Sequence, residues 1–378
     1  MSDTFDVIIL GLGGMGLAAL DQLALRDVNV LGLEQFHPGH EQGSSHGLTR
    51  IIREAYYEHP AYVPLVRRAF HLWYALEERT GNHVLNSAPC LTIGSPEGAM
   101  IRGIQTAARE HAIPIETLSA TEISSRFPAF RVPAEHVGVL ERNAGYLFVD
   151  ECQKAHRGSA LAADCSEIEE YAKVISWNAT SNGVVVQTTR EEYRAKKLII
   201  TAGAWSKKVL QKVGVPLTVM RQTMHWFHPD RIENFLRDRL PIFLMETPEG
   251  DFYGIPAINP LGLKVARHYG APELDGPDQV NWNMTPEDEK PVRAFLEKHL
   301  PEAAGRSGYS RPCMYTLTPD RHFIIDTHPE HDNVFFACGF SGHGYKFATV
   351  IGEILADLAT TGTTSHDISL FRLNRFSC

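Results

Sequence analysis

The sequence predicts a mixed α/β fold in which two domains are interleaved along the chain. Three observations support this prediction. A short apolar run near the N-terminus leads through a glycine-rich turn into an apolar helix. Two later apolar runs, at 193–205 and 333–340, have the character of buried strands that return the chain to the same domain. Between them, residues 227–311 contain many prolines and short strands, which indicates a second domain inserted into the first.

The N-terminal turn has the form of a Rossmann-like dinucleotide-binding motif. Val7 to Leu10 suits a buried parallel strand, and Gly11, Gly13 and Gly16 follow it within GLGGMG. These glycines allow, in order, a tight turn, the approach of a pyrophosphate to the helix N-terminus, and close packing of helix and strand. The next strand, VNVLGLE, ends at Glu34, where an acidic residue would accept ribose hydroxyls. The motif predicts nucleotide binding, although an ordinary doubly wound domain or a nicotinamide dehydrogenase would share it.

The inserted region carries a helix signal of its own. Thr285 can act as an N-cap, Pro286 fits the first turn, and Asp288 lies three residues after the cap. Acidic residues at this end suit the helix dipole. We therefore expect a helix over 285–299.

Charge and composition exclude several classes of function. The 378 residues carry a formal net charge of -9, which argues against a general nucleic-acid surface and requires local positive charge for an anionic substrate. No apolar stretch reaches the roughly 20 residues that span a bilayer, and the first strand begins within the first ten residues, so we expect a cytoplasmic protein. The cysteines lack zinc spacing, and His328, His331 and His343 have no helical pairing with a carboxylate. No metal site is predicted.

The C-terminal part holds a second glycine-rich turn and a lone cysteine. In GFSGHGYKF, Gly342 and Gly344 would let the backbone approach a flat ring, and the following helix would direct its N-terminal amides at that ring. Lys346 adds a full positive charge there, unless it extends to the surface. Cys313, in PCMYT, would by itself be read as a buried core residue. Taken with the N-terminal motif, the arrangement favours a flavin nucleotide.

Two arginines form a candidate anion site. Arg50 and Arg53 are three residues apart in LTRIIRE, which would place both on one face if the segment is helical. A guanidinium suits bidentate binding of a carboxylate. By themselves, two arginines beside an amphipathic helix would indicate a solvated face.

Over nearly its whole length, the chain resembles the monomeric sarcosine oxidase family of FAD-dependent amine oxidases, which includes N-methyltryptophan oxidase and L-pipecolate oxidase. The resemblance rests on GLGGMG, GSSHGLTRIIREAY, YVPL, TAGAW, CMYTLTPDRHFIID, GFSGHGYKFA and HDISLFRLNRF. It implies a FAD-binding domain of glutathione-reductase type, interleaved with a catalytic domain built on an antiparallel sheet. We expect the FAD-binding domain at 1–85, 145–220 and 320–378, and the catalytic domain at 86–144 and 221–319. The implied activity is oxidation of the secondary amine of an amino acid by oxygen.

The resemblance also assigns residues to the cofactor and to the substrate carboxylate. Cys313 matches the cysteine that holds FAD covalently, through a thioether to a methyl group of the flavin. His46 and Arg50 match residues beside the flavin, and Arg50 would also be part of the catalytic set. Arg53 and Lys346 match the pair that binds the substrate carboxylate, with Lys346 also next to the flavin.

The remaining catalytic candidates lie in the inserted region. Lys264 and His268 are four residues apart in GLKVARH, and residues at this spacing share a face of a twisting strand. The resemblance assigns oxygen activation to Lys264 and a place beside the amine to His268 and Tyr253. We expect these two and Tyr315 to shape the amine pocket rather than act as essential bases. Taken alone, the lysine and histidine would indicate a surface residue and a core residue.

The identity of the substrate stays open. Where sarcosine oxidases have HHGDTRIIRHAYGEG, this chain has SSHGLTRIIREAYYEH, so Ser45, Leu48 and Glu54 replace a histidine, an acid and a histidine. Arg267 and Phe252, which flank predicted pocket residues, also bear on the pocket. Sarcosine is the leading candidate, with L-pipecolate or an N-methyltryptophan-like substrate as alternatives. A flavin dehydrogenase with a non-oxygen acceptor and a non-catalytic nucleotide sensor are further alternatives. We expect a monomer that binds no nucleic acid and no membrane.

Overall fold

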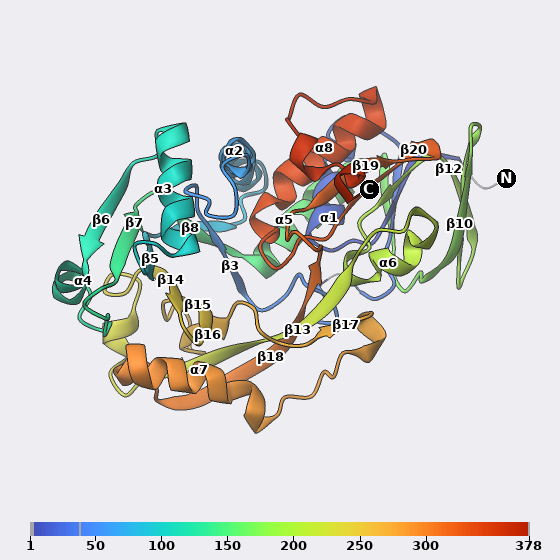
Figure 1. Cartoon of the computed structure of the whole chain (residues 1–378). Helices are drawn as coiled ribbons and strands as arrows, with labels where there is room; N and C mark the ends of the chain where they lie inside the picture. The colour runs from blue at the N-terminus through green and yellow to red at the C-terminus, as the bar shows by residue number, and fades with distance from the viewer. Residues whose placement is uncertain (1–3, 38, 377–378) are drawn as a thin grey trace.

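The computed structural model describes residues 4–37 and 39–376, and two large sheets dominate it (Figure 1). The first sheet is eight-stranded and has a parallel centre in the order β9, β2, β1, β12, with β20 also parallel to β12. β10 and β11 extend it in antiparallel fashion, and β19 pairs antiparallel with β20. The strands are β1 (Phe5–Leu10), β2 (Val30–Leu33), β9 (Ser166–Glu169), β10 (Val174–Thr180), β11 (Gly183–Thr188), β12 (Glu192–Ile200), β19 (Ile324–His328) and β20 (His331–Cys338).

The predicted first strand forms the middle of this sheet because both of its faces are apolar. Val7 and Ile9 pack into one hydrophobic cluster, while Ile8 and Leu10 pack into another on the opposite face. Four of the helices that contribute to the first cluster lie together beside the sheet in Figure 1. They are α1 (Gly14–Ala24), α2 (Tyr62–Thr80), α5 (Val149–Leu161) and α8 (Ala348–Thr361). α1 ends at Ala24.

The second sheet is nine-stranded and almost wholly antiparallel. Its order is β17, β13, β16, β15, β14, β5, β7, β6, with β18 paired to β13, and only β5 and β14 run parallel among its described pairings. The strands are β5 (Cys90–Gly94), β6 (Ile115–Ser119), β7 (Val137–Glu141), β13 (Thr218–His228), β14 (Ile242–Thr247), β15 (Gly250–Ile255), β16 (Leu263–Arg267), β17 (Glu273–Leu274) and β18 (Arg306–Leu317).

Shorter elements complete the fold. The predicted helix in the inserted region is α7 (Pro286–His299), where the carboxylate of Asp288 accepts a hydrogen bond from the backbone N–H of Thr285 at 2.8 Å. A three-stranded antiparallel sheet lies in the order β3, β8, β4. The remaining elements are β3 (Thr49–Ile52), β4 (Leu85–Ser87), β8 (Gly145–Phe148), α3 (Ala99–His111), α4 (Ala120–Arg126) and α6 (Ser206–Val209).

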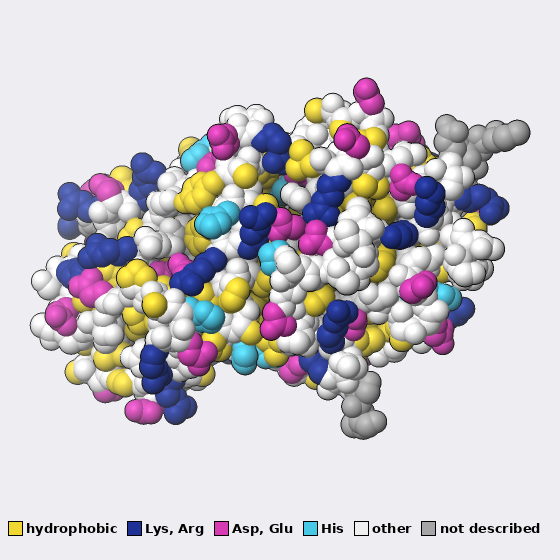
Figure 2. Space-filling view, turned by 90° about the horizontal axis from the view of Figure 1, so that it is seen from above, with side chains coloured by type: hydrophobic (Ala, Val, Ile, Leu, Met, Phe, Trp, Pro, Cys, Tyr) yellow, Lys and Arg dark blue, Asp and Glu magenta, His cyan; other side chains and the backbone are white. Residues whose placement is uncertain are grey.

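The predicted fold class is confirmed, because strands from distant parts of the chain share each sheet. Residues 5–33, 166–200 and 324–338 build the first sheet, while 90–141 and 218–317 build the second. We propose that each of the two predicted domains contains one of these sheets, with the boundaries predicted from the sequence. No helix among the described residues is long and apolar enough to cross a membrane. On the face shown in Figure 2, acidic and basic side chains are interspersed rather than gathered into one basic patch.

Candidate active site

The turn between β1 and α1 has the geometry that its glycines predict. Gly11 has φ +92°, and a Cβ there would lie 2.8 Å from the carbonyl oxygen of Thr201. A Cβ at Gly16 would lie 1.9 Å from the carbonyl oxygen of Gly11, so any side chain at this position would separate α1 from the turn. Gly13 is the N-cap of α1, which therefore presents its first backbone N–H groups toward the turn. This end of the helix suits an anionic group.

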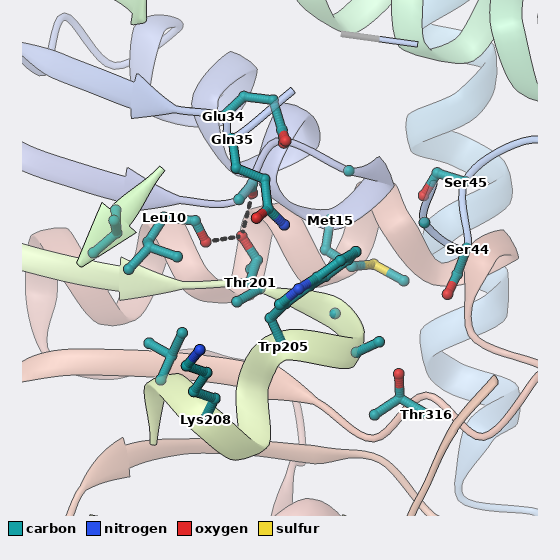
Figure 3. Close-up of a pocket in the computed structure, with 18 of the residues that line it drawn as sticks. Leu10, Met15, Glu34, Gln35, Ser44, Ser45, Thr201, Trp205, Lys208 and Thr316 are labelled. Carbon is teal, nitrogen blue, oxygen red and sulfur yellow. Dashed lines mark hydrogen bonds between the residues drawn. The ribbon is translucent and has the colours of Figure 1, made fainter. Parts of the chain in front are cut away.

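Glu34 follows β2 and is buried at the same turn. Its carboxylate accepts hydrogen bonds from the backbone N–H of Leu12 at 2.9 Å and of Phe36 at 3.0 Å. Figure 3 shows Glu34 and Gln35 on the opposite side of the pocket from Ser44 and Ser45. A carboxylate has about four acceptor positions, so Glu34 keeps capacity for ribose hydroxyls while it holds the turn.

One cavity of about 420 Å³ is lined by residues from both the N-terminal and the C-terminal parts of the chain. Eight of the residues predicted to touch a cofactor or substrate line it: Gly11, Gly13, Glu34, Arg50, Cys313, Tyr315, Gly342 and Gly344. Seven other predicted site residues are not among its described lining residues: Gly16, His46, Arg53, Tyr253, Lys264, His268 and Lys346. Thr201 and Trp205 also line it, and Figure 3 shows both projecting into the pocket from the segment that follows β12. Its lining combines the carboxylate of Glu34 with the guanidinium of Arg50 and the thiol of Cys313, and this chemistry fits a dinucleotide.

Gly342 and Gly344, which follow β20, line the same cavity as Cys313. Gly342 has φ +82°, and a Cβ there would lie 2.4 Å from the ring of Tyr315. A Cβ at Gly344 would lie 2.5 Å from the Cβ of Phe340. Both positions therefore require glycine for packing within the protein as well as for any approach of a ligand ring.

Cys313 lies on β18 with its thiol buried. Burial raises the pKa of this thiol, while the positive charges of Arg50 and Lys264 lower it. Arg50 donates to the backbone carbonyl oxygens of Thr49 and Ser44, both at 2.9 Å, which fixes its guanidinium beside the cavity. A nucleophilic thiolate would be stabilised by the same two cations.

Lys264 is buried near Arg50 and Cys313 rather than exposed at the surface. Its Nζ donates to the carbonyl oxygens of Gly47 at 2.7 Å and Thr49 at 2.9 Å, and lies 5.1 Å from the centre of the Trp226 ring. Burial, with a further effect of Arg50, lowers the pKa of Lys264 well below its ordinary value. The two carbonyl oxygens supply the hydrogen bonds that a buried ammonium needs.

His46 is buried beside these residues, and neither ring nitrogen has a hydrogen-bond partner among the described residues. Burial, followed by the charges of Arg50 and Lys264, lowers the pKa of His46 to about 3. The ring is therefore neutral at physiological pH.

Arg53 belongs to a second buried cluster. Its guanidinium forms an ion pair with Glu58 at 2.8 Å, donates to the carbonyl oxygen of Ala55 at 2.6 Å, and lies over the rings of Tyr56 and Tyr57. Burial alone would raise the pKa of Glu58, but the surrounding positive charges, Arg53 foremost, outweigh it and lower the pKa to about 2. The site thus already holds one ionised carboxylate.

Lys346 lies in the same cluster. Its Nζ donates to the carbonyl oxygen of His343 at 2.6 Å and to the hydroxyl of Tyr56 at 3.2 Å. Burial and, secondarily, Arg53 lower the pKa of Lys346 to about 7, against the opposing effect of Glu58. With only 6% of Lys346 exposed, the alternative that its side chain extends to the surface is wrong.

His268, Tyr253 and Tyr315 form an aromatic group beside this cluster. His268 Nδ1 and the Tyr315 hydroxyl are hydrogen-bonded at 3.2 Å, and the His268 ring meets the Tyr253 ring edge-on at 6.2 Å. Burial lowers the pKa of His268 to about 3 and raises that of Tyr253 to about 12. All three side chains are therefore uncharged at neutral pH.

Two sequence expectations need correction or addition. The segment of Arg50 and Arg53 is not helical, because Thr49–Ile52 forms β3 against β8. Arg50 consequently lines the cavity while Arg53 lies past the end of the strand. Sequence reasoning also missed Glu58, although an acid five residues after Arg53 in REAYYEH was a visible signal.

One group of metal-ligand type occurs among the described residues, in the turn between β19 and β20. His328, Glu330 and His331 each offer an atom within 4.8 Å of the others. The Nδ1 atom of His328 accepts a hydrogen bond from the backbone N–H of Glu330 at 3.1 Å, so this nitrogen already has a partner.

The fold and the cavity define a dinucleotide-binding protein, and comparison with known proteins specifies its family. The model of the FAD dependent oxidoreductase family matches residues 6–358, and the chain belongs to this family. It is 41% identical to monomeric sarcosine oxidase of Bacillus sp. (strain B-0618) over 380 residues, which cover 99% of this chain and 97% of that protein. It is 35% identical to N-methyl-L-tryptophan oxidase of Escherichia coli O139:H28 (strain E24377A / ETEC), with 98% and 99% covered.

Solved structures agree on the fold. The open form of NikD, an unusual amino acid oxidase essential for nikkomycin biosynthesis, is similar with a TM-score of 0.87 and 25% identity, and 98% of each chain is covered. L-proline dehydrogenase from P. horikoshii has a TM-score of 0.85 at 20% identity, covering 100% of this chain and 98% of that one. The predicted family, the enzyme class and FAD as cofactor are thereby confirmed. The glycine-lined cavity, which also has Glu34 and Cys313 in its lining, fits FAD.

Proposed function

We propose that this protein is a flavin-dependent oxidase of secondary amino acids, with sarcosine as the leading substrate. In this reaction an N-methyl amino acid, oxygen and water yield the demethylated amino acid, an aldehyde and hydrogen peroxide. The observation that carries the proposal is the buried pair Arg53 and Lys346 around one ionised carboxylate, Glu58. Relatives that share 35–41% of their residues with this chain are named as oxidases of N-methyl amino acids, which supports the same assignment.

The substrate carboxylate would bind to Arg53 and Lys346. A guanidinium and an ammonium together can satisfy both oxygens of a carboxylate, and their burial strengthens the interaction. Because the carboxylate of Glu58 is paired with Arg53 in this structure, a substrate carboxylate has to compete with the carboxylate of Glu58 for the guanidinium. We propose that Arg53 exchanges one carboxylate for the other.

Holding the carboxylate orients the rest of the substrate. The amine would lie against the uncharged group formed by Tyr253, His268 and Tyr315, where a neutral amine is favoured over a charged one. The chemistry supplied by bound FAD is removal of a hydride equivalent from the carbon beside the amine and transfer of its electrons to oxygen. A neutral amine needs no strong base for this step, so these three residues position the substrate.

We propose that Lys264 serves the oxygen half of the reaction. A positive charge near the flavin would favour electron transfer to oxygen, because it stabilises the negative charge that develops there. The carbonyl oxygens of Gly47 and Thr49 hold the Nζ atom in one place near Arg50 and Cys313. Arg50 would contribute to the same positive field.

We further propose that FAD is attached covalently through Cys313. The thiol is buried, lines the cavity and has Arg50 as its strongest positive influence. Joining its sulfur to a methyl carbon of the flavin is a two-electron oxidation, for which oxygen is the final acceptor. His46, neutral and buried nearby, would support the flavin end of the site.

A monomer is proposed because relatives at 39–41% identity are named monomeric.

The test is anaerobic addition of sarcosine, L-pipecolate or N-methyl-L-tryptophan while the flavin absorbance band is followed. Bleaching by sarcosine, with recovery and hydrogen peroxide when air is admitted, is the expected result. Bleaching only by another amine would move the substrate assignment to that amine. Bleaching without recovery in air would identify a dehydrogenase with another acceptor. No bleaching by any secondary amine would overturn the proposal in favour of a nucleotide-binding regulator.

A further inference from the structure

The chain between β3 and α2 carries both members of the Arg53–Glu58 ion pair and has no regular secondary structure. Two adjacent backbone N–H groups near its start bind one side chain. The N–H of Glu54 donates to Oε1 of Glu141 at 2.5 Å, and the N–H of Ala55 donates to Oε2 at 3.0 Å. One carboxylate from another part of the chain therefore anchors the start of this segment.

Glu141 is well placed to act as an anchor. It is the last residue of β7, where it pairs with Cys90 of β5 on one side and Ile115 of β6 on the other. Only 4% of Glu141 is exposed, so its position is fixed by the second sheet. Burial raises the pKa of Glu141 to about 7, and its two backbone hydrogen bonds oppose that rise. The ionised form is the one that accepts both N–H groups.

Ala55 links this anchor to the carboxylate-binding group. Its N–H is held by Glu141, and its carbonyl oxygen accepts from the guanidinium of Arg53 at 2.6 Å. The other side of that guanidinium binds Glu58, three residues further along the same segment. Glu141, Ala55 and Arg53 thus form a continuous series of hydrogen bonds from the second sheet to the cation.

We propose that Glu141 is a positioning residue for the substrate-carboxylate site, which sets the place of Arg53 by holding the backbone of Glu54 and Ala55. The inference rests on the proposed function for its consequence in substrate binding. Glu141 is not among the described residues that line the cavity. Its loss would leave two N–H groups without their acceptors and release the segment that orders Arg53 and Glu58.

The variant Glu141→Gln tests this because it keeps the size of the side chain and replaces one acceptor oxygen by an NH₂ group that cannot accept. Glu77→Gln is a control for the loss of a carboxylate charge, since Oε1 of Glu77, near the end of α2, accepts from the backbone N–H groups of Val84 at 2.8 Å and Leu85 at 3.2 Å. Both variants lose a carboxylate charge beside two backbone N–H groups, but Glu77→Gln can keep the one oxygen that accepts both, and only Glu141 is joined to Arg53.

The first measurement is the Kd of acetate, a carboxylate without an amine, from the shift of the flavin spectrum of the holoenzyme. We expect Glu141→Gln to raise this Kd roughly 10- to 100-fold, as misplacement of a binding group by about 1 Å does, and Glu77→Gln to leave it unchanged. The limiting rate of flavin reduction at saturating substrate should change much less than the Kd. An unchanged acetate Kd in Glu141→Gln, or an equal rise in Glu77→Gln, would overturn the proposal.

The second measurement is backbone hydrogen exchange, which needs no turnover. In the wild-type holoenzyme the N–H groups of Glu54 and Ala55 should be protected, and in Glu141→Gln they should exchange at least tenfold faster. If this variant fails to fold, the wild-type measurement decides, because fast exchange at both positions would refute the anchor. If wild-type protein binds no acetate and no amine reduces its flavin, the proposed function fails while hydrogen exchange still tests Glu141.

Discussion

The pKa of Lys346 gives a quantitative prediction for carboxylate binding. Burial and Arg53 lower this pKa to about 7, so the side chain loses its charge across the physiological range. Only the protonated form attracts an anion. The affinity that Lys346 adds for a carboxylate should therefore be complete well below pH 7 and decline as the pH rises above it.

The magnitude follows from the titration. With a pKa of about 7, about nine-tenths of Lys346 is charged at pH 6 and about one-tenth at pH 8, which is a tenfold loss or about 1.4 kcal/mol. A hydrogen bond to a charged group contributes about 1.5–3 kcal/mol, so Lys346→Met should weaken acetate binding roughly 10- to 100-fold at pH 6. The ratio of the variant Kd to the wild-type Kd should then fall about five- to tenfold between pH 6 and pH 8.

The ratio is the useful quantity because other groups titrate in both proteins. Glu141 also has a pKa of about 7, but its effect is common to wild type and variant and cancels in first order. The pKa values of Glu58, His268 and His343, at about 2, 3 and 4, lie below the measured range. Acetate has no amine to titrate, and the assay is the shift of the flavin spectrum on addition of acetate. A ratio that stays constant from pH 6 to pH 8 would refute the reasoning.

Four further predictions follow from the geometry. Cys313→Ser should release its flavin on acid precipitation while the wild type retains it, and release from both would exclude the covalent bond. Lys264→Met should slow reoxidation of reduced flavin by air about 10²- to 10³-fold with little change in anaerobic reduction, and reoxidation at the wild-type rate would contradict its role. Glu58→Gln should lower the acetate Kd, measured by the same spectral shift, because it removes the internal competitor for Arg53; a weaker complex would show instead that Glu58 is needed for binding. Gly16→Ala should lower the free energy of unfolding by more than about 3 kcal/mol, measured by thermal unfolding, and should reduce bound flavin. Gly158→Ala is the control: nothing lies within 4 Å of its added Cβ, so it should be neutral or stabilising.

The parts of the structure that could be predicted from sequence are those whose cause is local. The strand, turn and helix around Gly16 are encoded by an apolar run and by glycines whose missing side chains are needed within a few residues. The meeting of Gly11 and Cys313 in one cavity was predicted from motifs 300 residues apart, through the resemblance to a family rather than through periodicity. The N-cap at Thr285 was likewise a local signal.

The carboxylate-binding cluster could not be derived in the same way, because burial decides its chemistry. The spacing of Arg50 and Arg53 suggested a helical face, but pairing of Thr49–Ile52 with β8 made the segment a strand. The charge of Lys346 was expected at a helix start, whereas its lowered pKa comes from burial beside Arg53. Glu141, 88 residues after Arg53 in the chain, has no sequence signal that links it to that residue.

The internal ion pair between Arg53 and Glu58 has a consequence for how strongly this site can bind any substrate. A buried guanidinium without a partner would cost several kcal/mol, and Glu58 avoids that cost in the ligand-free protein. The same contact limits affinity, because a substrate carboxylate replaces an existing carboxylate rather than filling an unsatisfied site. The net free energy of binding is then a difference between two similar interactions with Arg53. Hydrogen bonds and contacts of the substrate with Lys346 and with the aromatic group around His268 would add to this difference. Specificity for the amine side of the substrate should accordingly depend more on His268, Tyr253 and Tyr315 than on the cations.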